Sequence, residues 1–301
     1  MPNMHFPTVA LVGKYHDTGI SAPLRAIAQI LRDAGRHVLF ELETAQNIGL
    51  TEFPVASVDE IGEQADLAIV MGGDGTMLGL ARQLAPYGVP LIGINHGRLG
   101  FITDIPLEDA STAIQRMLDG EFETEARSLL QSSVMREDDT LVSALALNDV
   151  VLSRAGLSGM LEITVHVDGL FMSKQRADGL IIATPTGSTA YALSVNGPIL
   201  HPRLRGLLVV PVAPQALSNR PITIPDSCEI VLTLTHSTSG RNEGASVHFD
   251  MQSWSSLQEG DRVVVRRSAH TVQLLHPVGY SYFSTLRRKL HWNQMSGSSI
   301  D

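Results

Sequence analysis

The stretch ADLAIVMGGDGTMLGLARQLA, residues 65–85, contains a strand-like run, a tight turn and a helix-like segment in direct succession. The apolar run 65–71 predicts a buried strand, and the apolar residues after the turn recur at helical spacing, which predicts a helix with one buried face. The amides at the start of such a helix face the end of the strand, where glycines let the backbone approach a ligand closely. The turn is therefore typical of an anion-binding loop. The apolar helix positions are Met77, Leu80, Ala81 and Leu84.

A carboxylate lies at the centre of this turn, because Asp74 stands among three glycines in GGDGT at 72–76. The turn lacks the lysine of GxxxxGKS/T, and its glycines miss the GxGxxG spacing, so neither standard nucleotide motif applies. Since like charges repel, an acid beside phosphates meets a proton or a metal ion. A carboxylate between a polyphosphate and an alcohol can accept the alcohol's proton during phosphoryl transfer. The alternative is a plain turn in which Asp74 or Thr76 caps the helix.

The first third of the chain alternates strand-like and helix-like patterns. Such alternation predicts a parallel sheet covered by helices, a Rossmann-like α/β domain over residues 1–123. Ser21 is expected to cap the first helix and Gly35 to end it. The strand-like runs are 8–13, 37–41, 65–71 and 90–95, and further helix-like segments are 21–35 and 107–120.

From residue 124 the pattern changes to strand-like segments separated by turn residues, which predicts a β-rich domain over 124–277. Strict alternation is clearest at Ile230, Leu232 and Leu234. Helical spacing returns at 280–292, so residues 278–301 are expected to pack back on the first domain. The strand-like segments are 161–169, 207–214, 229–237, 245–252, 261–268 and 271–277.

Composition and charge argue against nucleic-acid-binding and membrane-spanning functions. With 22 Lys and Arg against 31 Asp and Glu among 301 residues, the net charge is −9, and no basic block favours a nucleic-acid partner. No run approaches the ~18 apolar residues of a membrane span, and no leader pattern is present, so we expect a cytoplasmic protein without a membrane partner. The single Cys228 excludes an internal disulfide and a multi-cysteine zinc site.

A second informative stretch is RADGLIIATPTGSTAYALSVNGPI at 176–199. Its hydroxyl groups follow directly on the apolar run LIIA, which is typical of neutral hydrogen bonding to a polar ligand. The alternative is a Ser/Thr-rich surface loop. The hydroxyl residues are Thr184, Thr186, Ser188, Thr189, Tyr191 and Ser194.

A third stretch, ALALNDVVLSR at 144–154, is apolar except where Asn148 and Asp149 interrupt it. Buried polar groups need partners. Asp149 can accept hydrogen bonds from the two hydroxyls of a ribose, as acids in dinucleotide sites do, and Asn148 can donate a hydrogen bond beside it. A bulge or turn with its own backbone bonds is the alternative.

With GINHGRLGFITD at 93–104 and APQALSNRPI at 213–222, these motifs resemble the bacterial NAD kinase family over nearly the whole chain. GGDGT alone is shared with lipid kinases, whereas its combination with DGLIIATPTGSTAY is specific. The resemblance implies an α/β domain followed by a β-rich domain. It also implies a phosphotransferase with an alcohol acceptor, which moves the γ-phosphoryl group of a nucleoside triphosphate to the 2′-hydroxyl of the adenosine ribose of NAD, giving NADP.

The resemblance also implies roles for individual residues. Asp74 would be the base, and the phosphates would lie near Gly72, Gly73 and Thr76, with Lys14 after the first strand within reach. Mg²⁺ would arrive with the triphosphate, since no cluster of acids marks a protein-made metal site. The donor is left open between ATP and inorganic polyphosphate. The implied NAD contacts are Asp74, Gly75, Asn148, Asp149, Arg176, Asp178, Thr189, Ala190, Tyr191, Ala192, Leu193, Ser194, Ala213 and Gln252.

Two residues depart from the family pattern. Asn196 stands at a position where glycine is common, and asparagine tolerates positive φ better than most residues. Met251 replaces the glycine of Asp-Gly-Gln and so alters the turn before Gln252.

Two other functions stay open. A lipid or sugar kinase of the GGDGT type would need an apolar or polyol pocket at TPTGSTAYALS, and a non-catalytic NAD sensor would bind without turnover. Asp74 disfavours the sensor, because a sensor gains nothing from an acid beside phosphates. We also expect a homo-oligomer, a tetramer or a dimer, because the β-rich half offers apolar strands for pairing between chains.

Overall fold

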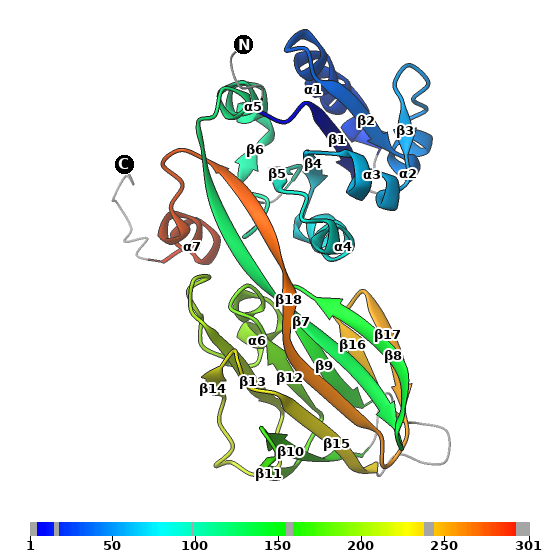
Figure 1. Ribbon diagram of the computed structural model, residues 1–301. Helices are drawn as coiled ribbons and strands as arrows, with labels where there is room; N and C mark the ends of the chain where they lie inside the picture. The colour runs from blue at the N-terminus through cyan, green and yellow to red at the C-terminus, as the bar shows by residue number, and fades with distance from the viewer. Residues whose placement is uncertain (1–4, 15–17, 98, 155–158, 238–243, 293–301) are drawn as a thin grey trace. The chain divides into compact units, whose positions relative to one another are not determined.

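The computed structural model describes residues 5–14, 18–97, 99–154, 159–237 and 244–292 (Figure 1). The chain divides into two compact units, Met1–Ala126 with Val272–Asp301, and Arg127–Thr271. No helix in the described ranges is long and apolar enough to cross a membrane.

The first unit is built on a parallel sheet with the strand order β3-β2-β1-β4-β5, and β6 lies beside β5. The last part of β18 (Arg262–Pro277) also pairs with β5, through Leu274 and Leu91. The central strands are buried on both faces, as expected for near-continuous apolar runs. The predicted parallel sheet is therefore confirmed. Its strands are β1 (Thr8–Gly13), β2 (His37–Glu41), β3 (Val55–Ala56), β4 (Leu67–Gly72), β5 (Leu91–Asn95) and β6 (Ile105–Pro106).

Helices cover both faces of this sheet. Ile92 and Ile94 point into the core that α1 and α5 cover. Gly93 points the other way, where a Cβ would lie 2.8 Å from Cε of Met77 on α4. Figure 1 shows α1 beside α5, and α3 beside α4. The helices are α1 (Ser21–Asp33), α2 (Leu42–Asn47), α3 (Val58–Gln64), α4 (Asp74–Leu84), α5 (Ala110–Leu118) and α7 (Tyr282–Leu290).

The start of α1 differs from the prediction. A 3₁₀ turn, η1 (Thr18–Ile20), runs directly into α1, so Ile20 takes the cap position and Ser21 is already helical. Ser21 is therefore not the N-cap, and no side chain caps this helix, because the preceding turn continues its backbone. Gly35 does follow the helix end, at φ 75°. The apolar pattern does not predict α3, although Ser57 and Glu60 form a complete capping box at its start.

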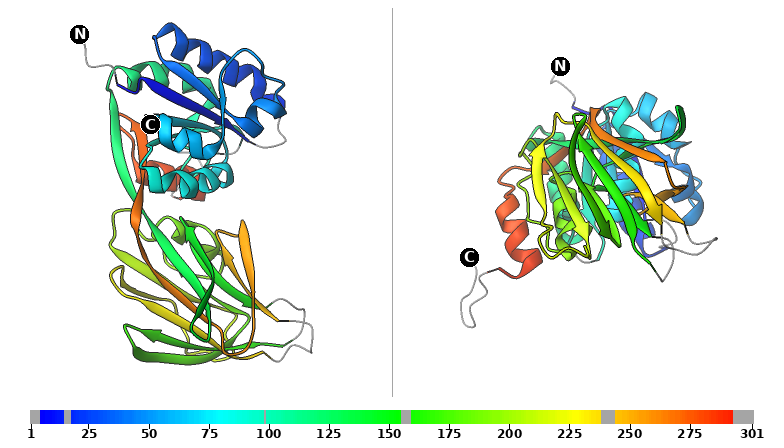
Figure 2. Two further views of the ribbon diagram at one scale, coloured as in Figure 1. Left: turned by 45° about the vertical axis from the view of Figure 1, so that its right-hand side comes forward. Right: turned by 90° about the horizontal axis from the view of Figure 1, so that it is seen from below.

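The second unit packs two sheets face to face, and its strands can be followed in Figure 2. One sheet is antiparallel with the order β14-β13-β12-β9-β16-β17, and the other contains β11-β10-β15-β18 with β7 and β8 alongside. Ile230, Leu232 and Leu234 are all buried in the shared core, as their alternation predicts. The strands are β7 (Phe122–Arg136), β8 (Asp139–Ala146), β9 (Asp149–Arg154), β10 (Leu161–Val167), β11 (Leu170–Ala177), β12 (Gly179–Ala183), β13 (Gly206–Val212), β14 (Ile222–Pro225), β15 (Ile230–Ser237), β16 (Ala245–Phe249) and β17 (Ser253–Leu257).

Two long strands differ from what the sequence pattern predicts. The patterns at 261–268 and 271–277 predict separate strands, but from residue 262 on both belong to the single strand β18. Neither Ala269 nor His270 between them is a turn former, so the extended backbone continues. The strand β7 was not predicted, because charged residues at its exposed start hide its alternation.

Candidate active site

The GGDGT turn joins the carboxyl end of β4 to the start of α4. Gly73 occupies the N-cap position with an extended backbone, and no side chain caps the helix. A Cβ at Gly72 would lie 2.8 Å from Oγ1 of Thr76, so this position favours glycine. The alternative in which Asp74 or Thr76 serves as a helix cap is therefore wrong. Gly75 and Thr76 lie in the first turn of α4, whose N-terminal dipole favours an anion.

The carboxylate of Asp74 is held by a second loop. Its Oδ2 accepts a hydrogen bond from Phe101 N at 2.8 Å. Its Oδ1 accepts from Ile102 N at 3.1 Å, Thr103 N at 3.2 Å and Thr103 Oγ1 at 3.0 Å. These residues belong to GINHGRLGFITD, in which Arg98 lies outside the described residues. The sequence marked this motif as part of the family likeness but gave no sign that it binds Asp74.

Lys14 lies next to the same turn. Its backbone N donates to Met71 O at 2.9 Å, directly after β1. Its Cβ lies 3.3 Å from where a Cβ on Gly72 would stand. The carboxyl ends of β1 and β4 thus bring an exposed lysine beside GGDGT, at the edge of the sheet where ligands bind in open α/β folds.

In the second unit, the TPTGSTAY stretch leaves the end of β12 and forms two short helices. They are the 3₁₀ helix η4 (Gly187–Thr189) and α6 (Tyr191–Ser194). Thr189, Ala190, Tyr191 and Leu193 are half-buried, Ala192 is buried and Ser194 is exposed.

Two buried hydroxyls of this stretch bond to backbone groups, whereas the sequence pattern predicts hydrogen bonding to a ligand. Thr184 Oγ1 donates to Leu147 O at 2.6 Å. Ser188 Oγ donates to Pro185 O at 2.6 Å and accepts from Leu200 N at 2.9 Å. Both side chains are fully buried, so these hydroxyls satisfy backbone groups and fix the turn.

The same turn lies against the Asn148–Asp149 segment. A Cβ at Gly187 would lie 2.1 Å from Asn148 O, so only glycine fits this approach. Thr184 N also donates to Asn148 O at 2.9 Å. Two motifs about forty residues apart in the sequence therefore meet in one place.

The interruption at Asn148 and Asp149 is a real break between β8 and β9, and Asp250 supports it. The carboxylate of Asp250 accepts from the backbone N atoms of Leu147, Asn148 and Asp149 at 2.9, 2.7 and 3.1 Å. The turn alternative was therefore correct in part, since the backbone is satisfied, although by a distant side chain. The sequence did not indicate that Asp250 has this role.

Asp149 itself is buried, with 1% of its surface exposed. Its Oδ1 has no hydrogen bond to any protein group in the described part of the chain. Burial and the charge of Asp250 raise the pKa of Asp149 to about 7. Near neutral pH this carboxyl can therefore donate or accept a hydrogen bond, which suits a ribose hydroxyl.

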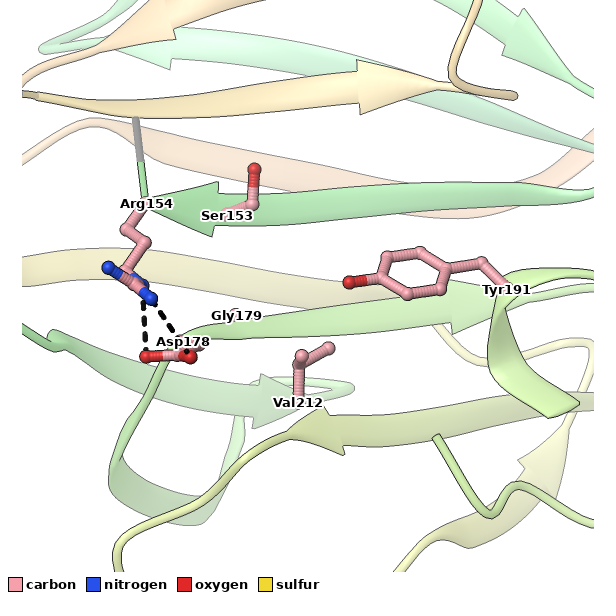
Figure 3. Close-up of a pocket in the computed structure, with 6 residues that line it drawn as sticks. All are labelled: Ser153, Arg154, Asp178, Gly179, Tyr191 and Val212. Atoms are coloured by element: carbon pink, nitrogen blue, oxygen red, sulfur yellow. Dashed lines mark hydrogen bonds and ion pairs between the residues drawn. The ribbon is translucent and has the colours of Figure 1, made fainter. Parts of the chain in front are cut away.

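A pocket of about 280 Å³ lies beside these motifs in the second unit (Figure 3). Arg154 Nε lies 3.0 Å from Asp178 Oδ1, and Nη2 lies 3.3 Å from Oδ2, so the pair is bidentate. Figure 3 shows the Tyr191 hydroxyl directed toward the middle of the lining residues. The pocket brings together the predicted residues Asp178 and Tyr191 and adds Arg154, for which the sequence gave no role. The lining residues are Ser153, Arg154, Asp178, Gly179, Tyr191 and Val212.

Other predicted contacts lie outside the lining of this pocket. Arg176 is exposed and pairs with Glu162 at 3.3 Å. Ala213 is exposed directly after β13, with φ 45°. Gln252 is exposed in the turn after β16, where its backbone N donates to Phe249 O at 3.0 Å.

The two departures from the family pattern both have left-handed backbones. Asn196 has φ 66°, in agreement with its occupying a glycine position. Met251 has φ 55° and follows Asp250, which has φ 52°. Met251 therefore stands where glycine would be unstrained.

Two family models match the chain, one in each unit. The model of the ATP-NAD kinase N-terminal domain matches residues 9–122, and that of the C-terminal domain matches 147–277. The chain belongs to the NAD kinase family. The NAD kinase of Bordetella avium strain 197N is 66% identical over 293 residues, covering 97% of each chain. The NAD kinase of Ralstonia nicotianae is 59% identical over 289 residues, covering 96% of this chain and 94% of its own.

Solved structures of an NADH kinase and an NAD kinase share the fold. The crystal structure of yeast NADH kinase complexed with NADH has a TM-score of 0.87 at 20% identity, covering 98% of this chain and 89% of its own. The NAD kinase from Archaeoglobus fulgidus in complex with ATP has a TM-score of 0.72 at 24% identity, covering 93% and 99%. The predicted membership and the combination of an α/β part with a β-rich part are confirmed.

Proposed function

We propose that this protein is an ATP-dependent NAD kinase, which transfers the γ-phosphoryl group of ATP to the 2′-hydroxyl of the adenosine ribose of NAD. The products are NADP and ADP. Relatives named NAD kinase at 66% and 59% identity support this reaction. The observation that carries the chemistry is the carboxylate of Asp74, held in one orientation at the start of α4.

Asp74 is the proposed proton acceptor. Its Oδ1 receives three hydrogen bonds and its Oδ2 only one. Because the acceptor sites of a carboxylate are divided between its two oxygens, Oδ2 retains one for a substrate hydroxyl. As the 2′-oxygen bonds to the γ-phosphorus, its proton passes to Oδ2 and ADP leaves with the electrons of the broken P–O bond.

The donor phosphates are proposed to bind at the GGDGT turn, with Gly72, Gly73 and Thr76 near them and Lys14 as the adjacent cation. Mg²⁺ enters as part of the ATP substrate and lowers the negative charge of the phosphates. No group of three or more His, Cys, Asp or Glu side chains that could hold a metal ion occurs in the described ranges.

The dinucleotide is proposed to bind along the second unit's turn and pocket. Asp178 and Tyr191 share the pocket, while Asn148 and Asp149 lie against the TPTGSTAY turn. The remaining contacts are proposed on the family likeness alone, and they are Gly75, Arg176, Thr189, Ala190, Ala192, Leu193, Ser194, Ala213 and Gln252.

A coupled assay for NADP tests the reaction. Purified protein is given NAD and Mg²⁺ with either ATP or inorganic polyphosphate, and NADP is read through an NADP-specific dehydrogenase. We expect NADP with ATP, and Asp74→Asn should lower kcat by about 10² to 10⁴ with little change in NAD affinity. Asp119→Asn, at an exposed position after α5, is the matched control and should keep full activity.

Three other outcomes of this assay would contradict parts of the proposal. Folded protein that binds NAD but forms no NADP is a sensor rather than a kinase. An Asp74→Asn variant with normal kcat but weak NAD binding would make Asp74 a binding group. If NADP formed with polyphosphate alone, polyphosphate rather than ATP would be the phosphoryl donor.

We also propose that the protein is a homo-oligomer in the cytoplasm, where ATP and NAD are available. The support for assembly is the edge strand β11 of the second unit, on which Leu170, Phe171 and Met172 are 74%, 64% and 37% exposed. Exposed apolar side chains on a strand at the edge of a sheet are typical of a surface that another chain covers.

A further inference from the structure

The turn that holds Asp74 leaves little room for adjustment. Gly100 N donates to Thr103 O at 3.3 Å, which closes the turn. A Cβ at Gly100 would lie 2.0 Å from Asp74 Oδ1 and 2.2 Å from Thr103 Oγ1. The hydrogen bonds to Asp74 therefore depend on the backbone path of this turn, and the next residue along that path is Asp104.

Asp104 is anchored by a buried histidine. His276, near the end of β18, is 1% exposed, and its Nδ1 lies 3.0 Å from Asp104 Oδ2. Its Nε2 lies 3.4 Å from Glu125 Oε2 on β7, an ion-pair distance. The imidazole also stacks on Tyr280, with ring centroids 3.8 Å apart and planes at 7°. His276 thus ties the residue after the turn to two other segments of the same unit.

We propose that His276 is a positioning residue for phosphoryl transfer, which through Asp104 holds the amides of residues 101–103 against Asp74 and so aims its carboxylate at the acceptor hydroxyl. His276 has this role only if Asp74 is the proton acceptor proposed above. It acts through the loop, since its two ring nitrogens face Asp104 and Glu125.

The charge of the imidazole determines how firmly it holds Asp104. Burial lowers the pKa of His276, but Asp104 and Glu125 raise it, and the net shift is upward from the ordinary value. The protonated ring has an N–H for each carboxylate, whereas the neutral ring has only one. Tyr280, a further titratable group, stacks on the ring. The contact is therefore complete below the folded-state pKa of His276 and weakens as pH rises through it.

The test compares His276→Gln with wild type at saturating NAD and ATP, so that pH effects on substrate binding do not enter kcat. We expect the variant's kcat at neutral pH to fall by up to about 100-fold, with little change in the KM for NAD. Wild-type kcat should decrease as pH rises through the pKa of His276, and the variant should lack this decrease. Hydrogen exchange in a peptide spanning 99–104 should be faster in the variant. His37→Gln, at an exposed position on β2, is the matched control and should behave as wild type.

A second variant keeps the test decisive if His276→Gln does not fold. Asp104→Asn should reproduce the loss of kcat, and the double variant should lose no more than either single one, because the pair acts as a unit. Wild-type kcat and pH profile in His276→Gln, or additive losses in the double variant, would overturn the role of His276. If Asp74→Asn loses activity while both of these variants keep it, only this inference fails. If Asp74→Asn keeps its kcat, the proposed role of Asp74 fails first.

Discussion

At the scale of single residues, the second unit contains a buried acid whose protonation state matters. Asp149 faces no hydrogen-bond donor for its Oδ1 among the described protein groups, and the nearby carboxylate of Asp250 is used by three backbone amides. Burial first, and then the charge of Asp250, raise the pKa of Asp149 to about 7. The native state therefore prefers the protonated acid.

Asp149→Asn should consequently change how stability depends on pH. In wild type the stabilising contribution of the protonated group is complete below the unfolded-state pKa of 3.8 and is lost as pH rises toward about 7. The amide does not titrate, so above pH 7 the variant should be more stable by a few kcal/mol at most. Urea unfolding at pH 5.5 and 8 measures this difference. The same variant should bind NAD more weakly, and parallel pH dependences for the two proteins would contradict the assignment.

At the scale of elements, the turn after β16 carries strain that the family pattern avoids. Asp250 and Met251 both have left-handed backbones, at φ 52° and 55°. Asp250 is fixed by its three hydrogen bonds to the Asn148 turn, but Met251 is 56% exposed and contributes little packing. The strain at Met251 is therefore not offset by buried contacts.

Met251→Gly should raise the free energy of unfolding by about 1 kcal/mol. A left-handed conformation costs an L-residue roughly 1–2 kcal/mol, and glycine removes this cost. The greater conformational freedom of glycine in the unfolded chain offsets part of the gain. Thermal unfolding measures the change in Tm. Asp250→Asn is the contrasting variant, and it should destabilise by about 1–3 kcal/mol, because one carboxylate oxygen becomes an amide nitrogen beside backbone donors. A lower Tm for Met251→Gly would show that the side chain packs in a way its exposure does not reveal.

At the scale of the whole molecule, the edge strand β11 is the proposed contact between copies of the chain. Phe171→Glu places a charge in the proposed interface and should shift the protein toward a smaller species in light scattering at micromolar concentration. Phe283→Glu on α7, an exposed position in the first unit, is the matched control and should leave the mass unchanged. Wild type that is monomeric and fully active at this concentration would contradict the proposed oligomer.

The sequence by itself determined the element types wherever apolar residues recur with a clear period. The alternation at Ile230, Leu232 and Leu234 and the helical spacing of Met77, Leu80 and Leu84 are local properties, and the structure buries all six side chains. GGDGT and TPTGSTAY were also found locally, since each motif occupies one short stretch. The pattern failed where charge masks the period, as at the start of β7.

Only the tertiary structure decided what each polar group in the site bonds to. Asp74 accepts hydrogen bonds from the backbone of Phe101, Ile102 and Thr103, which lie 27 to 29 residues away in the sequence. Asp250 accepts a hydrogen bond from the backbone of Asn148, 102 residues away. The hydroxyl of Ser188 looked available in the sequence but bonds to Leu200 inside the fold. Hydrogen-bond partners of this kind depend on strand register and on where chain segments cross, which no periodicity within a short window encodes.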